Sequence, residues 1–267
     1  VTNKTHLCEL GVQSAMMGQE AVFELNGMDV SRMAGVGSFA ERTIVRATSA
    51  IKIREDVPLD RACLVGCGVM TGVGAAINTA KVRPGQTVAV FGCGGVGLNV
   101  IQGAALAGAS RIIAVDLAAS KLVMAKAFGA TDVINAKDNP DASTAIKELT
   151  DGLGVDYAFE VIGVPSIIVQ AYMSVKRGGA AVVVGVPAMG SEIPVPSMMM
   201  ALEEKSMLGC LYGSGNLKRD MPMLLDLYMQ KKLKIDELVS KRIKLDDVNA
   251  AFEAMEKGEV ARSVIVY

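Results

Sequence analysis

The sequence predicts an α/β fold in which helices cover both faces of a doubly wound, parallel sheet. Two observations lead to this prediction. From about residue 86 onward, short β-branched apolar runs alternate with helical stretches, and a glycine-rich turn joins the first run to the first helix. Strands that are apolar along their whole length are typical of parallel sheets buried on both faces.

The expected strands and helices follow one another along the chain. We expect strands at Thr87–Phe91, Arg111–Asp116, Asp132–Asn135, Val155–Val161, Ala180–Val184 and Ser206–Leu211. Helices are expected at Gly95–Ala107, from Ser120 to Phe128, at Ala142–Thr150 and from Pro165 onward. Ser120 is expected to cap its helix and Gly129 to end it, while Pro165 suits a first helical position. Arg177-Gly178-Gly179 predicts a turn before the fifth strand.

The segments on either side of this core have a different pattern. Residues 1–57 contain short alternating pieces, Phe39–Arg46 and Ala50–Ile53, which predict strands too few to close a sheet of their own. After residue 212 we expect two amphipathic helices, near Lys218–Gln230 and Leu245–Glu256, and a closing strand at Ser263–Tyr267.

Composition argues against several classes of protein. Of 267 residues 51% are apolar, and 27 basic residues face 28 acidic ones, so no broad charge attracts nucleic acid or an anionic membrane. Five cysteines, a sparse and odd number, argue against a disulfide-rich secreted domain and favour a reducing, cytoplasmic setting. Residues 62–80 and 84–110 carry no charged side chain, but the turn residues of the second stretch favour a buried strand and helix over a membrane span.

The segment Gly92-Cys93-Gly94-Gly95-Val96-Gly97 matches G-x-G-x-x-G directly after the first strand. The first glycine permits a tight turn, the second lets the backbone approach a pyrophosphate, and the third lets helix and strand pack closely. Free N–H groups at the helix N-terminus favour phosphate binding. The motif in this context predicts a Rossmann-type dinucleotide site, with cofactor-binding residues Gly92, Gly94, Gly95, Val96 and Gly97.

Asp116 ends the second strand, 19 residues after Gly97, and is placed to accept hydrogen bonds from the 2′-OH of an adenosine ribose. A carboxylate there repels a 2′-phosphate, so NAD is favoured over NADP. Lys121, five residues further on, is a second candidate for the ribose, although a solvated helix lysine accounts for it equally well.

Two other nucleotide-binding families fit less well. Tyr172 and Lys176 have the spacing of the catalytic pair of short-chain dehydrogenases, but those enzymes carry G-x-x-x-G-x-G, which residues 92–98 lack. We interpret Tyr172 as a packing residue and Lys176 as a charge at a helix end. A methyltransferase is compatible with the glycine loop alone and is the weaker fit.

Further motifs reach beyond the core: Gly66-Cys67-Gly68-x2-Thr71-Gly72, Val115-Asp116, Glu160-Val161-Ile162-Gly163, Val184-Gly185-Val186-Pro187 and Gly258-Glu259-x2-Arg262. With the glycine loop, they resemble the zinc-dependent medium-chain alcohol dehydrogenases over nearly the whole chain. The resemblance is greatest to the branch of class III enzymes and bacterial relatives that oxidise thiol adducts of formaldehyde. It implies remnants of a β-rich, GroES-like catalytic domain at 1–68, a Rossmann domain at 69–211 and a return segment at 212–267.

The resemblance also implies roles for single residues in cofactor binding. Thr71 lies where the family contacts the nicotinamide and is expected to be catalytic as well. Arg262 matches the residue that pairs with the cofactor pyrophosphate. The backbone groups of Val184 and Val186 match those that meet the nicotinamide amide, and Tyr212 lines the region between cofactor and substrate.

For metal binding, the resemblance implies that Cys67 is the last of three protein ligands of a catalytic zinc, and so a catalytic residue. Cys8 matches the last of four cysteines around a structural zinc. The other ligands of both sites lie nearer the N-terminus in the family, so we expect this chain to be a fragment that lacks about the first quarter of the enzyme. Cys63, Cys93 and Cys210 are expected in the core, and His6 in a loop.

The function implied is hydride transfer between NAD and a primary alcohol or thiol–formaldehyde adduct, assisted by zinc in a cytoplasmic homodimer or homotetramer. Neither nucleic acid nor a membrane is an expected partner. From this chain alone we expect cofactor binding with little or no turnover. Two alternatives stay open: a nucleotide-binding module without redox chemistry, and a zinc-free reductase of the quinone-reductase type. Gly66-Cys67-Gly68 and Cys8 argue against the second.

Overall fold

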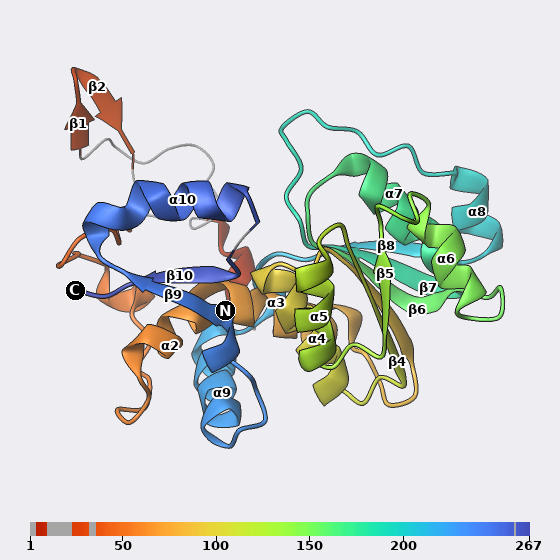
Figure 1. Cartoon of the computed structure of the whole chain (residues 1–267), viewed down its shortest axis with the longest axis horizontal. Coiled ribbons are helices and arrows are strands. Elements are labelled where there is room, and N and C mark those ends of the chain that lie inside the picture. Colours follow the sequence, from red (N-terminus) through yellow and green to blue (C-terminus); the bar gives the residue numbers. More distant parts are fainter. Residues whose placement is uncertain (1–3, 10–22, 32–35, 259) are drawn as a thin grey trace.

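A six-stranded parallel sheet dominates the computed structural model, which describes residues 4–9, 23–31, 36–258 and 260–267. Its strand order is β5-β4-β3-β6-β7-β8, and Figure 1 shows it in the lobe on the right. The strands are β3 (Thr87–Phe91), β4 (Arg111–Asp116), β5 (Asp132–Asn135), β6 (Val155–Glu160), β7 (Val175–Val183) and β8 (Ser206–Gly209).

Helices cover both faces of this sheet. They are α4 (Gly95–Leu106), α5 (Ala119–Ala127), α6 (Ala142–Glu148) and α7 (Pro165–Ser174), with the short α8 (Ser197–Leu202) before β8. Val88 and Val90 of β3 belong to the apolar cluster that contains residues of α4 and α5. Ala89 and Phe91 point to the opposite face and belong to a cluster with residues of α6 and α7. Burial on both faces explains why these strands are apolar throughout.

The structure confirms the predicted α/β fold with its doubly wound parallel sheet. Strands β3, β4 and β5 have the predicted bounds, and β6 and β8 end at Glu160 and Gly209, slightly before the predicted residues. Helices α4 and α6 also end early, at Leu106 and Glu148, and Pro165 opens α7 as expected.

Two local predictions in this lobe are wrong. The strand expected from Ala180 begins at Val175, and Gly178, with φ +73°, lies inside it near an irregularity in the pairing with β6. The expected turn is therefore a kink within one strand. Ser120 does not cap α5, because the helix begins at Ala119 after an N-cap at Ala118. The N–H of Ala118 donates to Asp116 Oδ1 (2.9 Å), so Asp116 organises this helix start.

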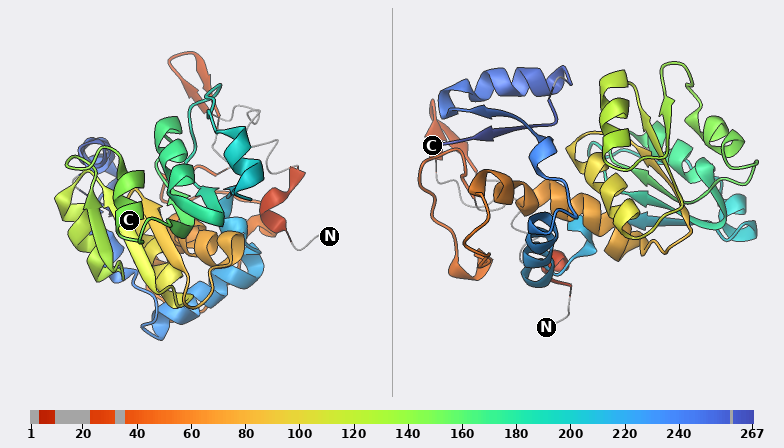
Figure 2. Two further views of the ribbon diagram at one scale, coloured as in Figure 1. Left: turned by 90° about the vertical axis from the view of Figure 1, so that its right-hand side faces the viewer. Right: turned by 60° about the horizontal axis from the view of Figure 1, so that its bottom comes forward.

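The other lobe collects segments from both ends of the chain (Figures 1 and 2). It contains a helical segment made of α2 (Leu59–Leu64), η4 (Val65–Val69), α3 (Met70–Gly74) and η5 (Ala75–Ala80), then α9 (Leu217–Met229), β9 (Val239–Ile243), α10 (Val248–Glu256) and β10 (Arg262–Ile265). Strands β9 and β10 pair in parallel, and β1 (Phe23–Leu25) pairs with β2 (Met28–Val30) in an antiparallel hairpin. Short 3₁₀ turns are η1 (Thr5–Leu7), η3 (Ala47–Ser49), η6 (Tyr212–Ser214), η7 (Asp236–Leu238) and η8 (Leu245–Asp247).

The strands predicted near the N-terminus are wrong. Within the described residues, Phe39–Arg46 and Ala50–Ile53 form no strand, and most of their side chains are exposed. A strand needs a neighbour to accept its ladder hydrogen bonds, and an alternating pattern cannot supply one. Near the C-terminus both predicted helices are present, α10 starting at Val248 after the turn η8, and the closing strand spans Arg262–Ile265.

The stretch 62–80 without charges lies in the helical segment Leu59–Ala80, which is the one helix among the described residues long and apolar enough to cross a membrane. Half of it is buried inside the protein, as in the core helix of a soluble protein. The second uncharged stretch, 84–110, becomes a loop, β3 and α4. The helical segment also runs across position 68, where one domain was expected to give way to the next, and the domain division stays a prediction.

A buried glutamine side chain of α4, Gln102, connects the lobes. Gln102 Nε2 donates to the carbonyl oxygen of Lys234 (3.1 Å), and the N–H of Lys234 donates to Gln102 Oε1 (2.9 Å). Gln102 Nε2 also donates to Asn99 Oδ1 (2.6 Å). Because both polar groups of the Gln102 amide are satisfied across the junction, they hold the loop after α9 against the sheet lobe.

The N-cap of α6 gives a first test of local stability. Asp141 Oδ1 accepts from the N–H groups of Ser143 (3.1 Å) and Thr144 (3.3 Å), and its two carboxylate oxygens also accept from their hydroxyls. Asp141→Ala removes these acceptors and should lower the free energy of unfolding by about 1 kcal/mol. Urea unfolding at neutral pH measures the change, and Asp138→Ala, an exposed residue before the helix, is the control.

The same bonds, first those from Ser143 and Thr144 side chains, hold the pKa of Asp141 below its ordinary 3.8. The stabilisation is therefore complete above that value and is lost as the pH falls through the lowered pKa. An Asp141→Ala variant as stable as the parent at neutral pH would contradict this assignment.

Candidate dinucleotide-binding site

The glycine-rich turn between β3 and α4 is shaped by close contacts of its own backbone. Gly92 has φ +96°, a backbone conformation that residues other than glycine rarely adopt. A Cβ atom at Gly97 would lie 1.8 Å from the carbonyl oxygen of Gly92, so Gly97 permits the contact between helix and strand. At Gly94, by contrast, a Cβ would have no described atom within 4 Å. Gly94 therefore has open space in front of it.

The carboxylate of Asp116 fastens this turn to the end of β4. Its Oδ2 accepts from the N–H of Cys93 (2.8 Å), while Oδ1 accepts from Ala118. Cys93 is buried, as expected, and burial together with the nearby Asp116 raises the pKa of its thiol to about 12. The thiol is therefore protonated at neutral pH and is a packing group rather than a nucleophile.

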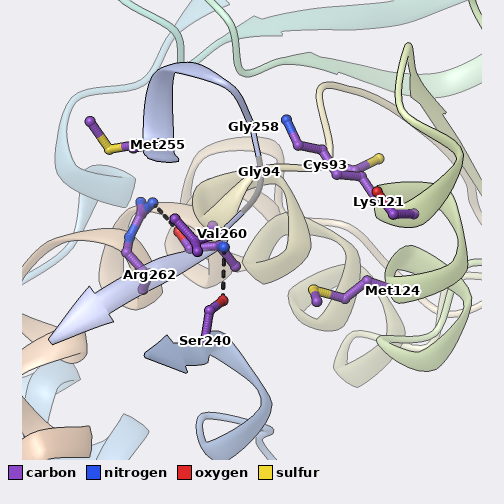
Figure 3. A pocket seen from close by; sticks show the side chains of 12 residues that line it. Cys93, Gly94, Lys121, Met124, Ser240, Met255, Gly258, Val260 and Arg262 are labelled. Carbon is purple, nitrogen blue, oxygen red and sulfur yellow. Dashed lines mark hydrogen bonds between the residues drawn. The ribbon is translucent and has the colours of Figure 1, made fainter. Parts of the chain in front are cut away.

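A cavity of about 210 Å³ opens in front of this turn, between the two lobes (Figure 3). The sheet lobe contributes the glycine turn and α5, and the other lobe contributes the chain around β9, α10 and β10. The lining residues are Cys93, Gly94, Gly95, Ser120, Lys121, Met124, Ser240, Met255, Gly258, Val260, Ala261 and Arg262.

Arg262 brings a positive charge to the first turn of α4. A Cβ atom at Gly95 would lie 2.5 Å from Arg262 Cζ, and one at Gly68 would lie 3.4 Å from Nη2. The guanidinium therefore packs directly on the helix N-terminus, and its Nη1 donates to the carbonyl oxygen of Ala261 (2.8 Å). The N–H of Ala261 in turn donates to Ser240 Oγ (2.9 Å), which fixes the segment before β10 against β9 (Figure 3).

Lys121 faces the same cavity from α5. Its Nζ lies 3.5 Å from the position of a Cβ atom on Gly258, which has φ +71° and ends the turn after α10. The structure thus brings together Gly94, Gly95, Lys121 and Arg262, four residues that were singled out from the sequence. Glu259, which belongs to the same motif as Arg262, lies outside the described residues.

These residues fit a dinucleotide pyrophosphate. The free N–H groups at the start of α4, the open space at Gly94 and the guanidinium of Arg262 all face one cavity. Phosphate groups are stabilised by unpaired helix N–H groups and by planar guanidinium donors. Val96, also expected to bind the cofactor, has its side chain 3.9 Å from the position of a Cβ atom on Gly68, beside Arg262.

The residues expected around the nicotinamide occupy three other segments. Thr71 is half-buried in α3, and its carbonyl oxygen lies close to Gly213. Tyr212 has φ +54° in the turn η6, and its hydroxyl donates to the carbonyl oxygen of Gly66. Val184 is buried, whereas the side chain of Val186 is 87% exposed.

The two cysteines implied in zinc binding are both exposed. Cys67 lies on the outer side of the helical segment 59–80, and Cys8 lies after the turn η1. Among the described residues, no three histidine, cysteine, aspartate or glutamate side chains gather closely enough to hold a metal ion. The described part of the chain therefore does not fit a zinc site.

The remaining cysteines and the single histidine have ordinary structural positions. Cys210 is buried as expected, but the expectation for Cys63 is wrong, since its side chain is exposed four residues before Cys67 on the same helical segment. That face points away from the core, to which Val65 and Val69 contribute. His6, expected in a loop, lies in the turn η1 and its Nδ1 hydrogen-bonds to the carbonyl oxygen of Gly215 (3.0 Å).

Tyr172 and Lys176 do not form a catalytic pair. Tyr172 is fully buried in α7, which confirms its interpretation as a packing residue. Lys176 is not at the helix end, because α7 ends at Ser174. Instead it pairs with Asp156 (2.7 Å), near the starts of β6 and β7, at the edge of the sheet opposite to the glycine turn.

Glu160 makes several hydrogen bonds at the end of β6, although the sequence predicted no role for it. Glu160 ends β6 with a fully buried side chain, and its Oε1 accepts from three consecutive backbone N–H groups. Nearby, Ile162 is half-exposed and packs on the glycine turn, 2.7 Å from the position of a Cβ atom on Gly92. The signal was present in the sequence: Glu160, like Asp116, is an acidic residue that closes an otherwise apolar strand.

Known proteins whose sequences match this chain are described as dehydrogenases. Residues 95–230 match the family described as zinc-binding dehydrogenase. The class-3 alcohol dehydrogenase of Pisum sativum is 39% identical over 98% of this chain and 71% of its own length, and that of Oryza sativa subsp. japonica is 40% identical over 99% and 71%.

Solved structures that match this chain are also described as alcohol dehydrogenases. Benzyl alcohol dehydrogenase from Acinetobacter calcoaceticus has a TM-score of 0.84 and 38% identity, over 87% of this chain and 64% of that one. An alcohol dehydrogenase zinc-binding domain protein from Burkholderia ambifaria has a TM-score of 0.90 and 31% identity, over 98% and 72%. The chain thus spans between 64% and 72% of the length of these four proteins.

Two glycine substitutions separate binding from folding at the turn. Gly94→Ala adds a methyl group to open space, so the temperature of unfolding should not change, whereas NADH binding should weaken by about tenfold or more because the methyl group occupies the approach of the pyrophosphate. Gly97→Ala forces the backbone of Gly92 to move and should lower the free energy of unfolding by about 1–3 kcal/mol. Fluorescence titration with NADH and thermal unfolding measure the two effects. A Gly94→Ala variant with the NADH affinity of the parent would show that the pyrophosphate does not approach this turn.

Proposed function

Because the chain belongs to the zinc-binding medium-chain alcohol dehydrogenase family, we propose that it is an NAD-linked alcohol dehydrogenase chain whose described residues bind the dinucleotide. The observation that carries this proposal is the cavity between the lobes, where the guanidinium of Arg262 lies on the N-terminus of α4. The substrate class that we propose is a primary alcohol or a thiol–formaldehyde adduct, in keeping with the class-3 alcohol dehydrogenases among its relatives.

The pyrophosphate of the cofactor is proposed to bind at the glycine turn. There the N–H groups of α4 and the guanidinium of Arg262 supply donors and positive charge from the two lobes. Gly92 and Gly97 shape the turn, while Gly94, Gly95 and Val96 form the surface that the phosphates approach. A bound dinucleotide would then stabilise the contact between the lobes, since it takes hydrogen bonds from both.

The adenosine ribose is proposed to bind beside Asp116 and Lys121. Each carboxylate oxygen of Asp116 already accepts one backbone N–H, and each keeps a further lone pair for a ribose hydroxyl. The negative charge of Asp116 disfavours a 2′-phosphate. Lys121 lines the cavity and supplies a donor to the same ribose.

The nicotinamide end is proposed to lie among Thr71, Val184, Val186 and Tyr212. When bound, the nicotinamide supplies the hydride chemistry, and the protein supplies orientation. The bond from the Tyr212 hydroxyl to Gly66 holds the turn η6 against the segment that carries Cys67. The division into units 1–68, 69–211 and 212–267, the homodimeric or homotetrameric state and the cytoplasmic location belong to the same proposal.

A second candidate function is a nucleotide-binding module without redox chemistry. It is favoured by one observation: the described residues assemble a cavity at the glycine turn, but no group of three metal-ligating side chains. Both candidates share the dinucleotide cavity. They differ in turnover, which absorbance of NADH with a primary alcohol or a thiol–formaldehyde adduct as substrate detects.

Cofactor choice tests the ribose assignment. The parent chain should bind NADH at least about tenfold more tightly than NADPH, because Asp116 repels the 2′-phosphate. Asp116→Asn removes the charge and should narrow this ratio, and it should also lower stability, since an amide cannot accept from both Cys93 and Ala118. Calorimetric titration gives the affinities, and Asp132→Asn, on the neighbouring strand, is the control with an unchanged ratio. Equal affinities of the parent for NADH and NADPH would remove Asp116 from the ribose site.

Metal removal tests whether protein groups alone are sufficient for NADH binding in the cavity. Chelation followed by dialysis should leave the NADH affinity unchanged, because the donors proposed for the dinucleotide are backbone N–H groups, Arg262 and Lys121. Elemental analysis confirms removal, and fluorescence titration before and after it gives the comparison. Loss of NADH binding that returns with added zinc would show that a metal organises the cavity.

A further inference from the structure

We propose that Glu160 is a positioning residue for the nicotinamide end of the dinucleotide, because it holds the two loops beside the point where the order of the strands reverses. This role rests on the proposed binding of NAD and goes beyond it. Neither the glycine turn nor the cavity around Arg262 includes Glu160.

The first argument is the place of Glu160 in the sheet. It is the last residue of β6 and pairs in register with Phe91, the last residue of β3 before the glycine turn. The strand order β5-β4-β3-β6-β7-β8 reverses direction between β3 and β6. In open parallel sheets, ligands bind outside the carboxyl ends of the strands at such a reversal.

The second argument is the number of backbone groups that Glu160 holds. Its Oε1 accepts from the N–H groups of Ile162 (2.9 Å), Gly163 (2.8 Å) and Val164 (3.4 Å), which form the turn before α7. Its own carbonyl oxygen accepts from Val184 (2.9 Å) and Gly185 (3.0 Å), which follow β7. One residue therefore anchors both loops. Oε2 is buried and has no hydrogen-bond partner in the described part of the chain.

The third argument is the tight contact between these two loops. A Cβ atom at Gly185 would lie 2.1 Å from the backbone nitrogen of Gly163, and one at Gly163 would lie 2.5 Å from the carbonyl oxygen of Val186. The side chain of Ile162 meanwhile rests on Gly92. Because these contacts are tight, a shift of residues 162–164 moves the backbone near Val186 with it.

The contacts also say which chemical feature of Glu160 matters. The three N–H groups need an acceptor oxygen at the position of Oε1, and a glutamine side chain can place its amide oxygen there. A methionine of similar length leaves the N–H groups unpaired, and an unpaired buried donor is costly. Glu160→Gln is therefore the conservative variant and Glu160→Met the disruptive one.

Two probes distinguish positioning from general stability. NADH engages the whole site, whereas ADP-ribose has the adenosine, the pyrophosphate and a ribose but no nicotinamide. Glu160→Met should bind NADH about tenfold more weakly and ADP-ribose within about twofold of the parent, while Glu160→Gln should bind both like the parent. Asp156→Asn is the matched control, because it changes a hydrogen-bonded carboxylate at the opposite end of β6. It should leave the ratio of the two affinities unchanged whatever it does to the unfolding temperature.

Each outcome decides the proposal. Equal losses for NADH and ADP-ribose, in step with the unfolding temperature, would reduce Glu160 to a structural residue, and parent-like NADH binding by Glu160→Met would overturn the role outright. A parent chain that binds neither probe would instead overturn the proposed function. If Glu160→Met does not fold, Glu160→Asp replaces it, because the shorter side chain keeps the carboxylate but moves its oxygen away from the turn. Glu160→Asp should show the same selective loss of NADH affinity. NADH binding as tight as in the parent would overturn the proposal.

Discussion

The loops that follow the carboxyl ends of the parallel strands carry backbone N–H groups that need hydrogen-bond acceptors. Two carboxylates, those of Asp116 and Glu160, supply them. Loops beyond the strand ends lie outside the ladder, yet here they are partly buried, so their N–H groups cannot rely on water. Asp116 accepts from Cys93 and Ala118, and Glu160 accepts from the turn that precedes α7. These two residues end β4 and β6, the strands on either side of β3. The shape of the glycine turn and of the loops beside it depends on both.

The candidate site is made by two lobes, and neither lobe contains all of it. The sheet lobe provides the glycine turn and Lys121, while Arg262 comes from β10 in the other lobe. The lobes meet through the buried amide of Gln102 and through the crossing of α3 and α4, where a Cβ atom at Gly72 would lie 2.4 Å from that of Asn99. Such contact allows little relative movement at the base of the cavity. Lys121 of the sheet lobe and Gly258 of the other lobe also lie close together in the lining of the cavity.

Local patterns were sufficient to predict the sheet lobe, because its strands are apolar on both faces and its turns carry glycine or proline. They failed where structure depends on a distant neighbour. Phe39–Arg46 alternates like a strand but has no partner among the described residues, and β9 was overlooked because its partner β10 follows it only after a helix. In the site, the resemblance to a family located Arg262, which no spacing rule connects to Gly95. Glu160 was missed because hydrogen bonds to backbone N–H groups leave no mark on a sequence beyond one acidic residue at a strand end.

The order of the lobes along the chain has a consequence for biosynthesis. Gly258 and residues 260–262, which form one wall of the cavity, leave the ribosome after all six strands of the sheet, so the sheet lobe can complete its core while the cavity still lacks that wall. The glycine turn then stands open to solvent until the parallel pair of β9 and β10 has formed. The cavity proposed for the nucleotide is therefore complete only after the segment around β10 has folded against the sheet lobe.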